Sequence, residues 1–175
     1  VSGLALSGTD ASNYTVSQPV GLTADITKAS VTLTGITASN KTYDATTAAT
    51  VSGGTFSGKY AGDVLTVNST GAFSDKNVGT GKTITLVNTL GGADLGNYDI
   101  TDQITTTADI AARAVTVSGV TASNKVYDAT TAATVNTGSA SLVGVLGGDA
   151  VTFDSASKSG VFGNKNVGTG KSVIV

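Results

Sequence analysis

The sequence has no cysteine, histidine, methionine or tryptophan, and each of its 12 acidic residues is aspartate. Without cysteine there can be no disulfide framework, no thiolate zinc site and no thiol nucleophile. Without histidine or glutamate the usual general acids and bases are also missing, and no glycosidase-type pair of carboxylates forms a visible motif. We therefore expect the chain not to be an enzyme.

Charge and long apolar runs are scarce as well. The 10 basic residues are spread singly along the chain and the net charge is −2, so no basic stripe is available for phosphates and we expect no nucleic-acid partner. No stretch approaches the ~18 apolar residues of a membrane helix, so we expect no membrane span. The sequence also starts in the middle of a pattern, without a signal-type segment, which predicts an internal piece of a longer chain.

What is abundant favours strands and turns. The chain has 23 glycines, one proline and many threonines and valines. Apolar residues alternate with polar ones, as at Val31 and Leu33 and again at Ile84 and Leu86. About seven short strands per ~85 residues predict an all-β protein of tandem, small, antiparallel, Ig-like β-sandwich domains in an elongated rod. A β-grasp-like unit is the alternative if the YDATTAATV segment holds a helical turn.

A long phrase occurs twice. TASNKTYDATTAATV at residues 37–51 and TASNKVYDATTAATV at residues 121–135 agree at 14 of 15 positions and lie 84 residues apart. KNVGTGK at 76–82 recurs at 165–171, 89 residues later, so the second copy carries five extra residues. A period of this length suits small autonomous domains rather than a solenoid.

The repeat sets the domain boundaries. Residues 10–26 match residues 94–110 at an offset of 84, so residues 1–27 are predicted to be the C-terminal part of a preceding repeat. Residues 28–111 then form a complete repeat and residues 112–175 a following, truncated one. An alternative frame divides the chain into 1–85 and 86–175. The joins have no Pro/Gly/Ser linker, so we expect neighbouring repeats to be stiffly connected.

The repeated phrase also contains the candidate site residues. One interpretation is a small polar site with Lys41 paired to Asp44, or an isopeptide crosslink between lysine and asparagine. The favoured interpretation is structural: the tyrosine packs inward while asparagine and aspartate cap a turn. The structural signature comprises Asn40, Lys41, Tyr43, Asp44, Asn124, Lys125, Tyr127 and Asp128. The expected aromatic core anchors are Tyr43, Tyr98, Tyr127, Phe56, Phe73, Phe153 and Phe162.

Two other motifs suggest ligands. VGTGKT at 78–83 lacks the first glycine of a phosphate-binding loop and precedes a strand-like segment, so we interpret it as a turn. Asp94, Asn97 and Asp99 could present oxygens to calcium, the one cofactor for which the sequence has candidates. An Asx-type turn explains Asp94 and Asn97 equally well, and we expect no other cofactor.

The motif combination resembles a known family. NKTYDATTAAT and NKVYDATTAAT, each followed by KNVGTGK, with GGADLGNYD closing the repeat, resemble the YDG-type repeats of very large bacterial surface proteins. These include filamentous-haemagglutinin-like adhesins exported by two-partner secretion. The resemblance departs at the third position of Tyr-Asp-Gly, where this chain has Ala45 and Ala129. If the family's glycine has a positive φ angle at this position, an alanine in its place would be strained.

The resemblance implies a place and a role. We expect an extracellular location, on the bacterial cell surface or secreted, and a structural stalk of an adhesin that projects a distal binding domain or forms a fibre. The expected partners are neighbouring repeats of the same chain. The alternatives are a module that binds surface glycan or a matrix or host protein, and a filament subunit that self-associates through its strand edges.

Overall fold

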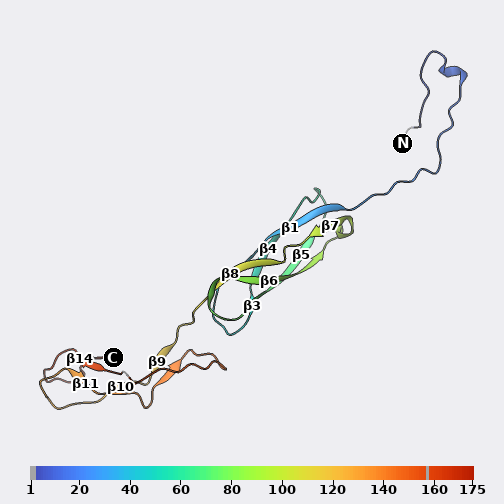
Figure 1. Ribbon diagram of the computed structural model, residues 1–175. Helices are drawn as coiled ribbons and strands as arrows, with labels where there is room; N and C mark the ends of the chain where they lie inside the picture. The colour runs from blue at the N-terminus through green and yellow to red at the C-terminus, as the bar shows by residue number, and fades with distance from the viewer. Residues whose placement is uncertain (1–2, 157) are drawn as a thin grey trace.

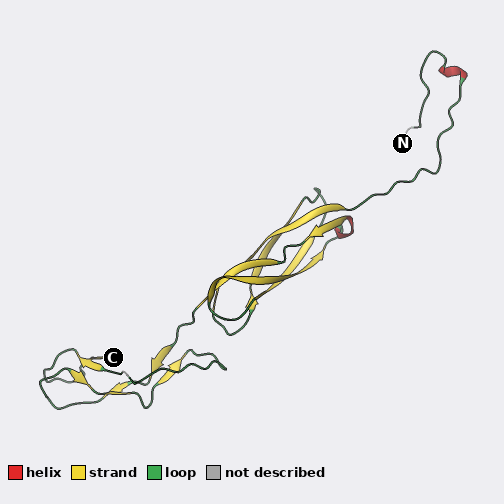
Figure 2. Ribbon diagram, in the orientation of Figure 1, coloured by secondary structure: helices red, strands yellow, loops and turns green. Residues whose placement is uncertain are grey.

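The computed structural model describes residues 3–156 and 158–175 and confirms that the protein is all-β, with 41% strand and 3% helix. The strands are β1 Ala29–Ala38, β2 Lys41–Thr42, β3 Ala48–Ala49, β4 Val51–Ser57, β5 Thr66–Phe73, β6 Gly79–Gly91, β7 Tyr98–Thr101, β8 Thr105–Ala111, β9 Thr116–Ser118, β10 Thr121–Ala122, β11 Ala132–Ala133, β12 Val135–Asn136, β13 Ser141–Val143, β14 Gly160–Phe162 and β15 Val173–Ile174. Two 3₁₀ turns, η1 Ala11–Asn13 and η2 Leu95–Asn97, are the helical elements of the described residues (Figure 2).

The central repeat, β1 to β8, forms one body from two sheets (Figure 1). The smaller sheet has the order β4-β1-β7 and the larger has the order β2-β8-β6-β5-β3. Their inward-facing side chains share one core, and the sheets curve around it until the body is nearly barrel-shaped. The buried members of this core are Leu33, Ile36, Phe73, Ile84, Leu86, Ala108 and Ile110.

Alternation along the strands places these residues in the core. In β1 the buried positions Val31 and Leu33 are separated by exposed Thr32, as a strand with one buried face requires. The segment Tyr43–Val51, in which the β-grasp alternative required a helical turn, contains strand β3 instead.

Two strand pairs are parallel, which a wholly antiparallel sandwich does not predict. Strand β1 pairs with β7 through Ala29 and Tyr98, and β2 pairs with β8 through Lys41 and Ile110. These pairs join the beginning of the repeat to its end, so a long connection is available to make them parallel. The fold of a repeat is therefore completed only when its last strands pair with its first ones.

A glutamine extends the closure along β1. Gln103 Nε2 donates to the carbonyl oxygen of Ile36 at 2.7 Å, and Gln103 Oε1 accepts from the Ile36 amide at 3.0 Å. The Gln103 side chain thus makes the backbone hydrogen bonds to Ile36 that a neighbouring strand would otherwise make. Ile36 is 2% exposed, so its backbone groups need such partners. The loop before β8 is fastened to β1 in this way.

The segments on either side of the central repeat leave it at opposite ends (Figure 1). The N-terminal segment turns back on itself around η1, so that the Leu4 amide donates to Gln18 Oε1 at 2.7 Å (Figure 1). The C-terminal segment forms small separate sheets, β10-β12, β11-β14-β15 and β13-β9. Its strands have two or three residues each.

The aromatic residues predicted to anchor the core differ in burial. Tyr98 and Phe73 are buried as predicted, and Tyr43 and Phe56 are half-buried against the core. Tyr127, the equivalent of Tyr43, is 56% exposed, so its assignment as a core anchor is wrong in this chain. The physical reason is that β8 pairs with β2 beside Tyr43, whereas among the described residues no strand pairs with the segment just before Tyr127. Phe153 and Phe162 are half-buried.

Candidate functional site

The signature lysine lies in a cradle of oxygen atoms. Lys41 Nζ donates to Asp44 Oδ1 at 2.8 Å, to the carbonyl oxygens of Thr46 at 2.9 Å and Ala48 at 3.0 Å, and to Thr46 Oγ1 at 3.2 Å. The ammonium group, which has three protons, also lies 5.2 Å from the centre of the Phe73 ring. Lys41 is in β2 and Phe73 ends β5, so the cradle joins the turn to the core.

The aspartate holds the turn from the other side. Asp44 Oδ1 accepts hydrogen bonds of 2.9 Å from both the amide and the hydroxyl of Thr46. The bond from Lys41, followed by that from the Thr46 amide, lowers the pKa of Asp44 to about 2. Its carboxylate oxygen is already engaged by neighbours within the turn, as in the structural interpretation of the motif.

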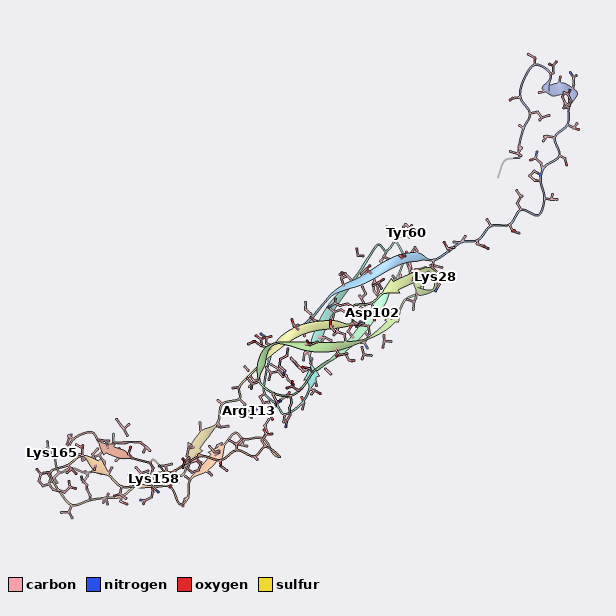
Figure 3. All side chains as sticks on the ribbon, viewed as in Figure 1. Lys28, Tyr60, Asp102, Arg113, Lys158 and Lys165 are labelled. Atoms are coloured by element: carbon pink, nitrogen blue, oxygen red, sulfur yellow. The ribbon has the colours of Figure 1, made fainter. Side chains whose placement is uncertain are left out.

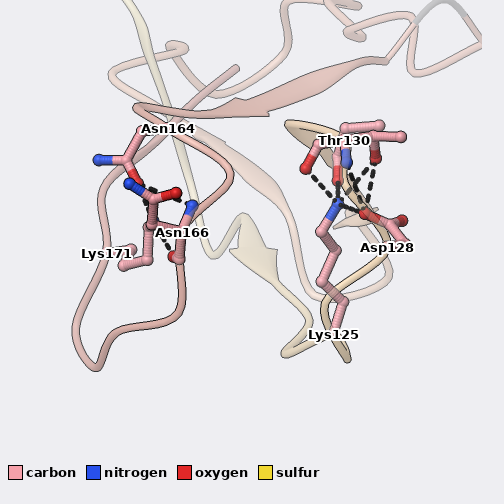
Figure 4. A network of polar contacts seen from close by, with 7 residues as sticks. Lys125, Asp128, Thr130, Asn164, Asn166 and Lys171 are labelled. Atoms are coloured by element: carbon pink, nitrogen blue, oxygen red, sulfur yellow. Dashed lines mark hydrogen bonds and ion pairs between the residues drawn. The ribbon is translucent and has the colours of Figure 1, made fainter.

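The following repeat builds the same cradle. Lys125 Nζ donates to Asp128 Oδ1 at 2.8 Å and to the carbonyl oxygen of Thr130 at 2.9 Å (Figure 4). The pKa of Asp128 is likewise lowered to about 2, chiefly by Lys125. The cradle forms here although Lys125 does not lie in a paired strand, as Lys41 does. It is therefore a local consequence of the KxYDATTA sequence.

The turn between lysine and threonine has a left-handed residue. Ala45 has φ of 65° and Ala129 has φ of 64°, in the region where alanine is strained. The departure from Tyr-Asp-Gly thus falls on a position whose backbone favours glycine. The hydrogen bonds around Asp44 and Lys41 compensate for that strain.

The asparagine before the lysine has a different role. Asn40 Oδ1 accepts from the Asp109 amide at 2.8 Å, and Asn40 Nδ2 lies 3.5 Å from Asp109 Oδ2. Asp109 Oδ1 also accepts from the Gly81 amide at 2.7 Å. Asn40 therefore fastens strand β8, and the structure pairs Lys41 with Asp44 rather than with an asparagine.

A second lysine site was missed from the sequence. Lys82 Nζ donates to Asp75 Oδ1 at 2.8 Å, and this bond lowers the pKa of Asp75. In the next repeat Lys171 Nζ contacts Asn164 Oδ1 and donates to the Asn166 carbonyl oxygen at 2.5 Å (Figure 4). The identical KNVGTGK phrases contain these lysines, but the change from Asp75 to Asn164 just outside the phrase hides the pairing. The glycines before Lys82 belong to β6, which is bulged between Gly79 and Lys82.

The signature tyrosine reaches the next repeat. Tyr43 Oη donates to Asp149 Oδ1 at 2.9 Å. Lys76 Nζ lies 3.4 Å from the same oxygen and 5.9 Å from the centre of the Tyr43 ring. The neighbouring Tyr43 hydroxyl and, after it, the Asp149 carboxylate raise the pKa of Lys76. We name this group, Tyr43, Lys76 and Asp149, the joint.

The candidate calcium ligands Asp94 and Asp99 make separate contacts with other residues. Asp94 Oδ2 accepts from the Val64 amide at 2.7 Å, and its side chain makes no capping bond to η2, so the predicted Asx turn is wrong. Asp99 lies 3.9 Å from Lys28 Nζ. Within residues 3–156 and 158–175 no cluster of three or more metal-ligating Asp, Glu, His or Cys side chains occurs.

Comparisons with known proteins return one family. The model described as the YDG domain matches residues 27–107 and again residues 111–175. No curated protein and no solved structure matches the chain. Among the described residues, no helix has both the length and the apolar character needed to cross a membrane.

Proposed function

This chain belongs to the YDG domain family, and from that premise we propose that it is a stalk segment of a large, secreted or surface-attached bacterial adhesin. In this role its repeats hold a distal binding domain away from the cell or pack as a fibre. The proposal extends to the finer architecture: consecutive β-sandwich-like repeats in an elongated rod.

The joint is the observation that carries the proposal. A spacer of tandem domains keeps its length only if neighbouring domains are restrained at their junction. Here the junction has a hydrogen bond and an ion pair converging on Asp149, and Lys76 lies over the Tyr43 ring. Asp149 is the less exposed partner of that ion pair, with 16% of its side-chain surface accessible.

The connection between repeats supports the same role. Strand β8 ends at Ala111 and β9 begins at Thr116, so four residues separate them, none of them glycine or proline. Arg113 Nε, within this connection, donates to the Gly144 carbonyl oxygen at 2.8 Å. The flanking segments leave opposite ends of the central repeat, as required for a linear array (Figure 1).

Small-angle X-ray scattering on proteins with two and four repeats tests the stalk. We expect the maximum dimension to increase in proportion to the number of repeats. A four-repeat protein whose maximum dimension is close to that of the two-repeat protein would contradict the proposal.

A binding module is the second candidate, and Tyr60 is the residue that favours it. Its ring is 67% exposed on the central repeat and lies 6.4 Å from that of Tyr98. Exposed tyrosine provides contact area for glycan or protein. The aligned position in the next repeat is Leu146, so this feature does not recur. A glycan array probed with the chain and with Tyr60→Ala would detect such binding.

A further inference from the structure

We propose that Asn68 of the central repeat is a glycosylation site, at which a sugar is linked to the side-chain amide nitrogen. The sugar shields an exposed strand edge that has no charge of its own. The inference goes beyond the stalk role and is independent of it, because it concerns a covalent modification of the central repeat alone. It rests on an acceptor sequence, on the direction of the Asn68 side chain and on the composition of the edge.

The acceptor sequence Asn-x-Ser/Thr occurs at residues 68–70. A sugar linked to the asparagine of this sequence is a bulky, solubilising group on the protein surface. The same sequence also occurs at residues 40–42 and 13–15, so the motif alone does not distinguish among the three asparagines.

Strand β5 presents Asn68 to solvent. Side chains alternate along β5, so that Val67 and Ser69 are half-buried while Asn68 and Thr70 are exposed. Asn68 lies opposite Thr89 of β6, which is also exposed. A sugar on the outward amide therefore extends into solvent without displacing a core residue.

Asn40 has the acceptor sequence, but its amide group is already in use. Asn40 Oδ1 accepts from the Asp109 amide at 2.8 Å, and Asn40 Nδ2 lies 3.5 Å from Asp109 Oδ2. A sugar on Nδ2 would occupy the side of the amide that faces Asp109 and would loosen strand β8. Asn40 is therefore an internal control at which the folded structure excludes the modification.

Asn68 lies on an open edge of the five-stranded sheet. Strand β5 pairs with β6 from Thr66 to Phe73. On its other side β3 pairs only with Gly71 and Ala72. Among the described residues no strand pairs with that side of β5 from residue 66 to residue 70. Such an edge has unpaired amide and carbonyl groups with which a strand of another chain can pair.

This edge lacks the usual protection against pairing. Natural edge strands are blunted by lysine, by proline or by a covering element, and residues 64–74 contain no charged residue and no proline. The neighbouring surface is also uncharged, since Val87, opposite Thr70, is 65% exposed. A strand-forming segment without charge is the type that associates with other chains.

The following repeat has a charge at the same position. The offset of 86 residues that relates Gly58 to Gly144 places Asp154 at the position of Asn68. The Asp154 side chain is exposed as well. A carboxylate protects an edge by its charge, and a sugar protects it by bulk and hydration. With a sugar on Asn68, both repeats have a strongly hydrated group at this position.

The transfer is a substitution at the anomeric carbon of a sugar activated by a diphosphate. Asn68 Nδ2 forms a bond to this carbon while the bond from the carbon to the diphosphate oxygen breaks. The diphosphate leaves with the electron pair of the broken bond, and the amide nitrogen loses one proton to a base of the glycosyltransferase. The reaction needs no oxidant or reductant.

The position of the site leaves the ends of the repeat free. Strand β5 runs along the side of the central repeat, whereas Lys28 and Arg113 mark its two ends (Figures 1 and 3). The joint connects Tyr43 to Asp149, which lies beyond Arg113 in the chain. A sugar on Asn68 is therefore compatible with the contact between repeats.

Peptide mapping of the protein isolated from the cells that produce it tests the site. Trypsin places Asn68 in the peptide of residues 60–76 and Asn40 in the peptide of residues 29–41. We expect the first peptide to carry the mass of at least one sugar, located on Asn68 by electron-transfer fragmentation, and the second to be unmodified. An unmodified peptide 60–76, or a sugar on Thr66 or Thr70 instead, would overturn the proposal.

Variants of the third acceptor position, produced in the same cells, test the recognition. Thr70→Ala removes the hydroxyl and leaves Asn68 in place, so the sugar should be lost. Thr70→Ser keeps a hydroxyl and should retain the sugar. Thr70 is exposed, so both variants should fold. A sugar that remains on Asn68 in Thr70→Ala would contradict recognition of the acceptor sequence.

Sedimentation analysis over a concentration series tests the shielding. Asn68→Gln lacks the sugar and should associate at a concentration about tenfold lower than the glycosylated protein. Asn68→Lys also lacks the sugar but places a charge on the edge, so it should stay as dispersed as the glycosylated protein. Equal association of Asn68→Gln and the glycosylated protein would show that the sugar does not shield the edge.

Discussion

Tyr43 of the central repeat donates its hydroxyl hydrogen bond to Asp149 of the following repeat, across 2.9 Å. The ring of Tyr43 packs partly on the core of its own repeat, so one side chain contributes both to a domain and to its junction. The phrase that marks the repetition in the sequence is therefore also the place where consecutive repeats are joined.

Removing only the hydroxyl should loosen the junction without unfolding a repeat. We expect Tyr43→Phe to leave the melting of the central repeat nearly unchanged, because the ring keeps its packing. The distribution of distances between spin labels on the two repeats, measured by pulsed electron resonance, should broaden. Tyr60→Phe, at an exposed tyrosine of the same repeat, serves as the control and should not broaden it.

Removing the whole side chain should affect stability differently at the two signature tyrosines. Tyr43→Ala deletes a ring that packs on the core and should destabilise the central repeat by about 3 kcal/mol. Tyr127→Ala, at a 56% exposed ring, should change the free energy of unfolding of the monomeric chain by less than about 0.5 kcal/mol. Urea unfolding at low protein concentration measures both, and equal losses would contradict the structure.

Glycine at the left-handed position of the turn should stabilise the protein. Ala45 has φ of 65°, where an L-residue costs roughly 1–2 kcal/mol and glycine does not. The greater flexibility of glycine in the unfolded chain offsets part of this gain. We expect Ala45→Gly to raise the free energy of unfolding by about 0.5–1 kcal/mol. Ala49→Gly, in strand β3, should instead lower it.

Acid should weaken the lysine cradle. The pKa of Asp44 is about 2 in the folded protein against 3.8 ordinarily, so the charged form is favoured by folding. A carboxyl with a lowered pKa contributes its stability above the unfolded value and loses it as the pH falls through the folded value. The melting temperature should therefore decrease between pH 3.8 and pH 2.

Asp44→Asn tests the source of this pH dependence. The variant should be less stable than the parent at neutral pH, because an amide does not attract the Lys41 ammonium as a carboxylate does. Its stability should also decline less over the same acid range. An identical decline in parent and variant would assign the pH dependence to other carboxyls.

Local features of this chain follow from its sequence. Alternating Val31 and Leu33 indicate a strand with one buried face, and the repeated phrases give the offset that relates Ile26 to Ile110. The lysine cradle is also local: its donors and acceptors lie within eight residues, and it forms in the central and in the C-terminal repeat alike.

Tertiary structure decided what depends on distant segments. The parallel pairing of β2 with β8, the bridge from Gln103 to Ile36 and the reach of Tyr43 to Asp149 each join residues more than 60 positions apart. Local patterns contain no information on such pairs, because they depend on how the whole chain closes. Tyr43 and Tyr127 make the difference clear. Nearly identical surroundings in sequence give a half-buried ring beside the β2–β8 pair and an exposed ring in the C-terminal repeat, whose described residues contain no such pair.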